Sequence, residues 1–303
     1  QGYPFDNWQE SLLAPNEPVY VLHTSQDQAW NFVITGSHLC GWVQRSDIAY
    51  ATPAFIAQWK TGSYTTPLRD DVVVTGNACA PLARVGQLIP LAHEQNSTDN
   101  YQVLTVVTNS EGYAAVKVRT VCQEATAVMP LLATPHNMAR IANSLIGQPY
   151  GWGGLEGYRD CSALIKDLLM PFGIWMPRDS GPQAKAGTWV SLEGLKNDQK
   201  AKVIREQGIP FFSLIWLPGH IVLYVGAQEK SVYVYHNLWG LRTNSMTGKE
   251  GRAILGKTVL MPLDLGKAYS NIRKTLLDKA TGLILLTDRL VNPHAELALL
   301  NKA

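Results

Sequence analysis

The sequence has few cysteines, and those it has are far apart. Cys40, Cys79, Cys122 and Cys161 are spread over 303 residues and include no C-x-x-C pair. That spacing argues against a zinc ribbon and against a thioredoxin-type redox site. Four cysteines are also too few for a fold built on disulfides in a chain of this length. The sequence permits one disulfide or none, and it does not say which cysteines would pair.

An excess of charge of one sign is also missing. Lys and Arg number 26 and Asp and Glu number 24, which gives a net charge of +2. The basic residues form no cluster beyond scattered pairs. Because nucleic-acid binding relies on a basic patch that neutralises phosphates, we expect no nucleic-acid partner.

Long uninterrupted hydrophobic runs are absent as well. Residues 208–228 contain no Asp, Glu, Lys or Arg, but Pro218, Gly219 and His220 interrupt them. A span would need about 20 predominantly apolar residues, whereas two buried strands flanking a Pro-Gly turn fit the pattern better. We therefore expect no transmembrane span. The opening QGYPFDNW lacks Met, a basic region and an apolar region, which favours a chain whose leader has been removed.

What is present is a globular composition with a β-rich first half. Hydrophobic residues make up 46% of the chain, enough to bury a core. Short apolar segments separated by polar or glycine-containing turns predict strands, and one helix is expected after Thr52, which can cap it ahead of Pro53. We interpret residues 1–64 and 65–133 as two small β-barrel modules. The predicted strands of this half are 19–22, 31–34, 41–43, 72–74, 101–107 and 113–118.

The composition changes in the second half, where the order of helical and strand patterns predicts an α+β domain over residues 134–303. Asn137 could cap a helix over 138–146, with Gly147 ending it, and a second helix is expected over 162–170 before Pro171. Strands are expected at 221–225, 232–235 and 258–261. The tail from residue 267 onward is interpreted as one or two helices that cover the sheet.

Cys161 is the candidate nucleophile. It follows a turn rich in glycine and aromatic residues and opens the second predicted helix, where free N–H groups and the helix dipole favour an anion. Such a position is expected to lower the pKa of a thiol. The glycines would let a ligand approach the backbone closely. The alternative is a buried structural cysteine, which is common for this residue type.

Two histidines could complete the chemistry. His220 begins one predicted strand and His236 lies at the end of the next, and adjacent antiparallel strands can place them side by side. His220 would take the proton of the Cys161 thiol and later protonate the leaving amine, while His236 would bind the other nitrogen of His220 and fix its tautomer. Zinc bound by the same three residues is an alternative, but no two of them have the short spacing typical of metal ligands.

The residues around these three extend the pattern into an ordered series of motifs. That series resembles the NlpC family of papain-like cysteine peptidases over about residues 135–265. Gly41-Trp42-Val43 and Gly86-Gln87-Leu88-Ile89-Pro90 are similar to the bacterial SH3-like modules that precede this domain in one branch of the family. The matching motifs are Tyr150-Gly151-Trp152-Gly153-Gly154, Asp160-Cys161-Ser162, Pro177-Arg178-Asp179-Ser180, Gly219-His220-Ile221-Val222-Leu223-Tyr224-Val225-Gly226 and the later His236.

The resemblance implies a papain-like fold and hydrolysis of peptidoglycan stem peptides between γ-D-glutamate and the diamino acid, usually meso-diaminopimelate. It implies Cys161 as nucleophile, His220 as base and His236 as the third polar residue. In the branch with SH3-like modules, the positions of Asp160 and Ser162 help to bind the free amine of L-alanine. Asp160 would also oppose formation of a thiolate, so the helix dipole and a protonated His220 must outweigh it.

Further positions carry over from the same resemblance. Tyr150 would border the active site, and Arg178 and Ser180 would belong to a loop that walls the pocket. On residue types alone, a turn with a solvated ion pair is the first interpretation of residues 176–183, and a wall of the substrate pocket that supplies polar contacts is the second. Ala163 departs from the glycine usual in the family, and the aromatic residue expected near Trp42 to close the amine pocket is not evident. A need for a free amine therefore stays open.

Three function classes remain in view. An endopeptidase is the leading hypothesis, an amidase or acyltransferase on the same Cys–His frame is the second, and a non-catalytic cell-wall binding protein is the third. We expect peptidoglycan stem peptides as partner, no metal, no organic cofactor and a monomeric chain. The substrate predicts a periplasmic or other extracytoplasmic location.

Overall fold

A computed structural model of the chain describes residues 3–75, 82–92, 99–244 and 250–287. Contacts within it divide the chain into two compact units. Unit 1 comprises residues 1–12, 146–165 and 178–303, and unit 2 comprises residues 13–145 and 166–177. The first twelve residues thus group with the second half of the chain, although most of the first half lies in unit 2.

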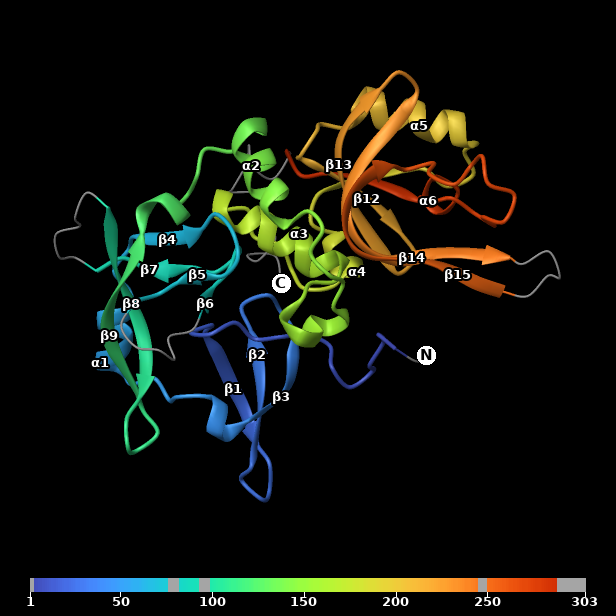
Figure 1. Ribbon diagram of the computed structural model, residues 1–303. Coiled ribbons are helices and arrows are strands. Elements are labelled where there is room, and N and C mark those ends of the chain that lie inside the picture. The colour runs from blue at the N-terminus through green and yellow to red at the C-terminus, as the bar shows by residue number, and fades with distance from the viewer. Residues whose placement is uncertain (1–2, 76–81, 93–98, 245–249, 288–303) are drawn as a thin grey trace, which may run out of the picture. The chain divides into compact units, whose positions relative to one another are not determined.

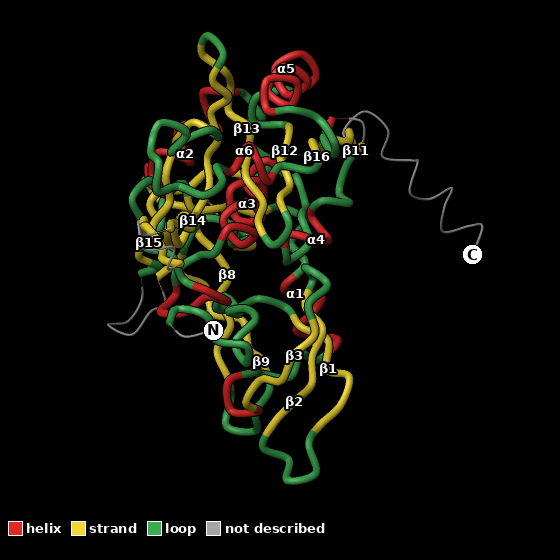
Figure 2. The backbone as a smooth tube through the Cα atoms, turned by 90° about the vertical axis from the view of Figure 1, so that its right-hand side faces the viewer, coloured by secondary structure: helices red, strands yellow, loops and turns green. Residues whose placement is uncertain are grey.

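Unit 1 is built on a six-stranded antiparallel sheet with the strand order β11-β16-β12-β13-β14-β15. The central strands β12, β13 and β14 are labelled in Figure 1, and Figure 2 shows β13, β12, β16 and β11 side by side. The strands are β11 (Thr188–Ser191), β12 (Ser213–Leu217), β13 (His220–Gln228), β14 (Ser231–Asn244), β15 (Glu250–Pro262) and β16 (Gly282–Leu285).

The uncharged stretch from residue 208 forms the hairpin that the sequence predicts. Strands β12 and β13 pair through Leu217 and His220, and Gly219 between them has a φ of 77°, which glycine adopts without strain. Ile215 and Val222 are completely buried. No helix in the described part of the chain is long and apolar enough to cross a membrane.

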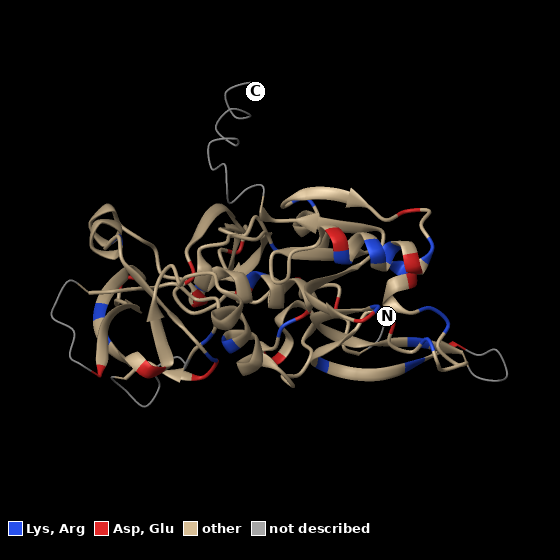
Figure 3. Ribbon diagram, turned by 90° about the horizontal axis from the view of Figure 1, so that it is seen from above, with Lys and Arg blue, Asp and Glu red and all other residues tan. Residues whose placement is uncertain are grey.

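Short helices surround this sheet. Helix α5 packs its Ala201 and Ile204 into the core formed with β12, β13 and β14, and the Nζ of Lys200 donates to the carbonyls of Leu277, Asp278 and Ala280. Helix α5 carries both acidic and basic residues, which Figure 3 draws in red and blue: Asp198, Lys200, Lys202, Arg205 and Glu206. The helices are η3 (Trp152–Gly157), α3 (Cys161–Leu169, whose last residues from 166 belong to unit 2), α4 (Ser180–Gln183), α5 (Asn197–Gln207) and α6 (Leu276–Lys279).

The prediction of a helical tail is wrong for most of the described residues. Within residues 267–287 only α6 and Thr287 are helical, and the apolar run after α6 forms β16, which pairs with β11 and β12 inside the sheet. Glycine fits at position 282 of this strand because a Cβ there would lie 2.0 Å from the indole of Trp189 on β11. Residues 288–303 lie outside the described residues.

Unit 2 consists of small pieces of sheet. Its elements are β1 (Val19–Thr24), β2 (Trp30–Thr35), β3 (Cys40–Gln44), η1 (Arg45–Asp47), α1 (Pro53–Trp59), β4 (Tyr64–Pro67), β5 (Val72–Val73), β6 (Leu82–Ala83), β7 (Ile89–Pro90), β8 (Asn100–Thr108), β9 (Ala114–Cys122), η2 (Gln123–Ala125), β10 (Thr126–Val128), α2 (Pro135–Leu145) and η4 (Met170–Phe172).

The predicted strands of the first half are present. Strands β1, β2 and β3 form one sheet, β4 lies between β10 and β7 in another, and β8 pairs with β9 across the turn that joins them. A second core gathers around Val72, Val103 and Val121. That these strands form two separate barrel modules stays a prediction.

Of the two helix N-caps predicted in unit 2, one is correct and one is wrong. The Thr52 side chain accepts the N–H of Phe55 at the start of α1, which confirms the expected cap. Helix α2 begins before Asn137, and the Oγ1 of Thr134 accepts the N–H of Asn137 instead. Pro135 follows Thr134 directly, so the cap and proline pattern that identified α1 also fits the start of α2.

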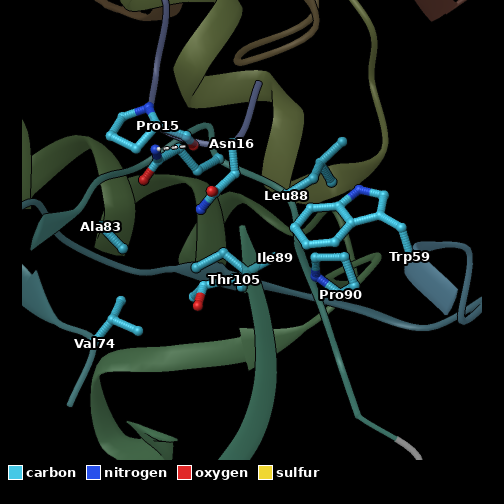
Figure 4. A pocket seen from close by; sticks show the side chains of 10 residues that line it. Pro15, Asn16, Trp59, Val74, Ala83, Leu88, Ile89, Pro90 and Thr105 are labelled. Carbon is cyan, nitrogen blue, oxygen red and sulfur yellow. Dashed lines mark hydrogen bonds between the residues drawn. The ribbon is translucent and has the colours of Figure 1, made fainter. Parts of the chain in front are cut away.

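A small pocket lies in unit 2, where the indole of Trp59 stands beside Pro90 and Leu88 (Figure 4). The remaining lining residues are Pro15, Asn16, Val74, Ala83, Gln87, Ile89 and Thr105. It includes part of the segment 86–90 that is similar to SH3-like modules. None of the predicted catalytic or substrate-binding residues lines it.

Candidate active site

Cys161 is the first residue of α3, as predicted. The Oδ1 of Asp160 accepts the N–H of Ala163 at 2.9 Å, and the Asp160 carbonyl accepts the N–H of Leu164. Asp160 is therefore the N-cap of the helix, a position that aspartate favours because it satisfies a free N–H group. Cys161 is buried, with 8% of its surface exposed.

His220 and His236 meet through their rings, which confirms the expected contact. The Nε2 of His220 lies 2.8 Å from the Nδ1 of His236. His220 opens β13, but His236 lies within β14, not at its end as predicted, because β14 continues to Asn244. The longer strand results from pairing with β15, which extends from Asn244 back to Tyr233.

The thiol of Cys161 does not have the lowered pKa that its position at a helix start predicts. Burial is the largest influence and the neighbouring Asp160 carboxylate is the next, and together they raise the pKa to about 12. Hydrogen bonding with the backbone of Ile221 and Ser162 acts in the opposite direction but is weaker. The partnership with Ile221 sets the sulfur against the first residues of β13, beside His220. Desolvation thus outweighs the helix dipole here.

Both imidazoles are neutral for the same reason. Burial lowers the pKa of His220 to about 4, against a smaller raising influence of Asp160. Burial and then His220 lower the pKa of His236 well below its usual value. The free site consequently contains a neutral thiol and neutral imidazoles at pH 7, not a thiolate–imidazolium pair.

The contact between the histidines restricts the proton positions. For His220 to accept a proton at Nδ1, its own proton must sit on Nε2 and be donated to the Nδ1 of His236. His236 then carries its proton on Nε2, an atom that is buried without a hydrogen-bond partner among the described residues. The hydrogen bond fits either direction of donation, and this tautomer is the one that a role of His220 as a base requires.

Arg178 connects the start of α3 with the N-terminal segment, which we define as residues 3–12. Its Nη2 donates to the Oδ2 of Asp160 and its Nη1 to the Oγ of Ser162. Its Nε donates to the Oγ of Ser11 at 3.1 Å, and Nη2 also reaches the carbonyl of Glu10 at 3.3 Å. Burial opposes the charge of Arg178, but the Asp160 carboxylate raises the pKa of the guanidinium on balance.

The glycine-rich turn receives this N-terminal segment. Gly153 has a φ of +57°, and a Cβ there would lie 2.0 Å from the carbonyl oxygen of Gln9. Gly154 has a φ of +87°, and a Cβ there would lie 2.4 Å from the Cβ of Leu12. From the sequence, these glycines are expected to admit a ligand. In the structure the backbone that approaches them belongs to the same chain.

Aromatic contacts and hydrogen bonds fix the segment further. Phe5 packs edge-on against Trp152 with ring centroids 5.1 Å apart, and also contacts Tyr150 at 6.5 Å. The Nε1 of Trp152 donates to the carbonyl of Asp6 at 2.7 Å, and the Nε2 of Gln9 donates to the carbonyl of Gly153. Residues about 145 positions apart in the chain thus form one wall of the site.

The other predicted residues lie as follows. Tyr150 is buried, and burial first, with the charges of Cys161 and Asp160 next, raises the pKa of its phenol, so the hydroxyl stays protonated. Ser162 is buried, and its Oγ donates to the Oδ1 of Asp160 at 3.0 Å. Ser180 begins α4, two residues after Arg178 in the chain.

Two positioning residues were not singled out from the sequence. The Nε2 of Gln183 donates to the carbonyl of Ser162 at 2.8 Å and ties α4 to the start of α3. The Nδ2 of Asn237, next to His236, donates to the carbonyls of Pro149 and Arg159. Both side chains are completely buried, and no local pattern distinguishes them from ordinary loop and strand residues. Gln183 lies in the polar loop 176–183, which was the only signal available for it.

The described residues contain no group of three or more His, Cys, Asp and Glu side chains that could hold a metal ion. Cys40 and Cys122 are exposed free thiols, and Cys161 is a buried one. Cys79 lies outside the described residues.

The model of the NlpC/P60 family matches residues 147–249, which include all three candidate catalytic residues, and the model described as SH3 domain (SH3b1 type) matches residues 1–44. The chain therefore carries an NlpC/P60 domain. The SH3b domain precedes it, and a second SH3-like module is not confirmed.

Two curated relatives share the name gamma-D-glutamyl-L-lysine dipeptidyl-peptidase. The protein of Bacillus subtilis is 32% identical over 135 residues, which cover 42% of this chain and 43% of the relative. That of Bacillus cereus is 33% identical over 82 residues, which cover 27% of this chain and 23% of the relative. The matches thus span less than half the length of either relative.

Among solved structures, an NlpC/P60 endopeptidase from Photobacterium damselae subsp. piscicida is 29% identical, with a TM-score of 0.83. The match covers 94% of this chain and 67% of that one. An NlpC/P60 family protein from Bacillus cereus is 16% identical with a TM-score of 0.62, covers 91% of this chain and 81% of that one, and is similar in fold.

Proposed function

We propose that unit 1 is a cysteine peptidase that hydrolyses the bond between γ-D-glutamate and the following diamino acid in peptidoglycan stem peptides. The observation that carries the proposal is the 2.8 Å contact between the rings of His220 and His236, with Cys161 at the start of a helix beside the same strand. The names of the curated relatives support the γ-D-glutamyl bond as the target.

The acylation step follows from the neutral groups of the site. The sulfur of Cys161 attacks the γ-carbonyl carbon while the Nδ1 of His220 takes the thiol proton. Because thiol and imidazole are neutral before attack, the proton transfer accompanies formation of the carbon–sulfur bond. His236 accepts the Nε2–H of His220 and holds the ring in place. The bond to the diamino acid breaks as His220 gives the proton to the leaving nitrogen.

Deacylation repeats the sequence with water. His220 takes a proton from the water as its oxygen attacks the thioester carbon, and the sulfur leaves and recovers that proton. The products are the γ-carboxylate of the glutamyl peptide and the free amine of the diamino acid. In both steps the negative oxygen would be stabilised by N–H groups at the start of α3, including that of Cys161.

The residues around the sulfur form the proposed substrate site. Tyr150 borders the reacting sulfur through a neutral hydroxyl, and Asp160, Ser162 and Arg178 make up the buried polar floor beside it. Ser180, in the loop that follows Arg178, belongs to the pocket wall. We propose that the enzyme acts outside the cytoplasmic membrane, because peptidoglycan lies there, and that no metal takes part.

Mass spectrometry of peptide products tests the proposal. L-Ala-γ-D-Glu-meso-diaminopimelate is incubated with the unaltered chain, with Cys161→Ala and with Cys122→Ala. We expect L-Ala-D-Glu and free diaminopimelate from the first and third proteins and neither product from the second. Cys122→Ala is the matched control because Cys122 is a free thiol that is exposed and in unit 2.

The alternatives predict different products. Transfer of the glutamyl group to an added amine, in preference to water, would support an acyltransferase. Binding of peptidoglycan without any cleavage would support a non-catalytic protein. Equal product from Cys161→Ala and the unaltered chain would refute the role of Cys161.

A further inference from the structure

Asp160 is a carboxylate with no acceptor position left for a substrate. Its Oδ1 accepts the Oγ–H of Ser162 and the N–H of Ala163. Its Oδ2 accepts the N–H of Gly153 and a guanidinium N–H of Arg178. A carboxylate offers about four such positions, and groups of the chain fill all of them.

Arg178 also donates hydrogen bonds to other groups of the protein. Besides Asp160 and Ser162, its donors reach Ser11 and Glu10 of the N-terminal segment, and only 2% of its side chain is exposed. A substrate ammonium could reach Asp160 only by displacing the guanidinium. Breaking a buried ion pair of this kind costs several kcal/mol, because it would leave the guanidinium as an uncompensated buried charge.

Two further carboxylates lie near Arg178 and have to be weighed. Asp179 is 3.6 Å from the Nη1 of Arg178, and its side chain is 54% exposed. Glu10 is exposed as well. Exposed ion pairs contribute about 0.2–1 kcal/mol, which corresponds to a preference of about fivefold or less. Their attraction for an ammonium is therefore small beside that of an unpaired buried carboxylate.

The remaining polar group beside the sulfur is uncharged. Tyr150 keeps its proton and can donate its O–H to a carbonyl oxygen. An amide therefore finds a partner in this place, whereas an ammonium finds no free buried anion among the residues that the structure describes beside the sulfur.

We propose that Arg178 is a specificity-determining residue that masks Asp160, so that the enzyme cleaves stem peptides whose L-alanine amine is acylated about as well as those in which it is free. This inference rests on the proposed function and specifies its substrate class: peptides without a free amino terminus, as in a stem still joined to a glycan strand. A dipeptidyl-peptidase acts from a free amino terminus, so this chain would differ in that respect from what its curated relatives are named for.

The test compares kcat/KM for L-Ala-γ-D-Glu-meso-diaminopimelate and for its N-acetyl derivative with the unaltered chain. We expect the two values to agree within tenfold. A preference of more than tenfold for the free peptide would overturn the inference while leaving the proposed function intact. Cleavage of neither peptide would overturn the proposed function and the inference with it.

Two variants test the masking itself through the ratio of the two kcat/KM values, from which a general loss of active protein cancels. Arg178→Gln frees one acceptor position of Asp160 and should shift the ratio toward the free peptide by tenfold or more. Arg252→Gln removes a cation that lies 5.5 Å over the ring of Phe5 but does not contact Asp160, and it should leave the ratio unchanged. An unchanged ratio in a folded Arg178→Gln protein would refute masking; if that variant does not fold, the comparison with the unaltered chain decides.

Discussion

Replacing Gly153 by alanine should detach the N-terminal segment from the active site. A Cβ at this position lies 2.0 Å from the carbonyl oxygen of Gln9, far inside ordinary van der Waals contact, and the obstacle is backbone. The segment has to move away by about 1 Å or more, because carbon and oxygen atoms settle only beyond about 3 Å. Gly153 also has a φ of +57°, where an L-residue is strained.

Gly157 provides the matched control within the same turn. Its φ is +79°, but nothing lies within 4 Å of a Cβ built there. Gly157→Ala should therefore cost only the left-handed conformation, about 1–2 kcal/mol of unfolding free energy. Gly153→Ala carries the same cost and also weakens the hydrogen bonds that Gly153, Trp152 and Arg178 make with the segment. At about 1 kcal/mol for each such bond, we expect a total of about 3–5 kcal/mol.

Urea unfolding of both variants gives the two free energies, and limited proteolysis reports on the segment. Gly153→Ala should expose residues 3–12 to cleavage at urea concentrations that leave the rest of unit 1 folded, and Gly157→Ala should not. Its kcat/KM should also fall, because Arg178 loses its partners Glu10 and Ser11. Equal unfolding free energies for the two variants, with an equally protected segment, would refute this account of the glycine-rich turn.

The other predictions concern the three candidate catalytic residues. His236→Ala should lower kcat about 100-fold or more while KM changes little, since orienting a general base is worth about that factor; steady-state kinetics check this, and an unchanged kcat would count against the histidine pair. A variant in which the other cysteines are serine isolates the reaction of Cys161 with iodoacetamide. The rate of this alkylation should rise about tenfold per pH unit up to pH 10, because a thiol with a pKa of about 12 gains thiolate throughout that range. A plateau of the rate below pH 8 would indicate a preformed thiolate. Folding keeps His220 neutral with a pKa of about 4, so as the pH falls below about 6.5 this histidine takes up a proton in the unfolded chain before it does in the folded one. The free energy of unfolding should therefore drop between pH 7 and pH 4 by up to about 3 kcal/mol from this residue. Urea unfolding at several pH values measures this drop. Dialysis against EDTA should leave peptide cleavage unchanged, and a loss restored by zinc would revive the metal alternative.

Local sequence patterns predicted the parts of this fold in which neighbouring residues decide the structure. Thr52 before Pro53 identified the start of α1, and Pro218-Gly219 between two apolar runs identified the hairpin that places His220. The helix start at Cys161 and the contact between His220 and His236 also followed from position along the chain. In each case a short pattern contains the physical cause.

Packing between residues that are far apart in the sequence could not be predicted from local patterns. Gln9 lies 144 residues from Gly153, and nothing near either residue indicates that their backbones meet. The strand β16 was mistaken for part of a helix because its short apolar run has no periodicity, and its pairing with β11 and β12 is not visible in the local sequence. The pKa of Cys161 was predicted in the wrong direction, since the helix start is visible in the sequence but the depth of burial is not.

The central claim is that Cys161 forms a covalent intermediate with the glutamyl carbonyl. Acid quenching during turnover of L-Ala-γ-D-Glu-meso-diaminopimelate, followed by mass spectrometry of the intact and digested protein, tests it most directly. We predict an added L-Ala-D-Glu acyl group on the peptide that contains Cys161, absent in Cys161→Ala and accumulating more slowly in His220→Ala. Product formation without any adduct, or an adduct on another cysteine, would contradict the claim.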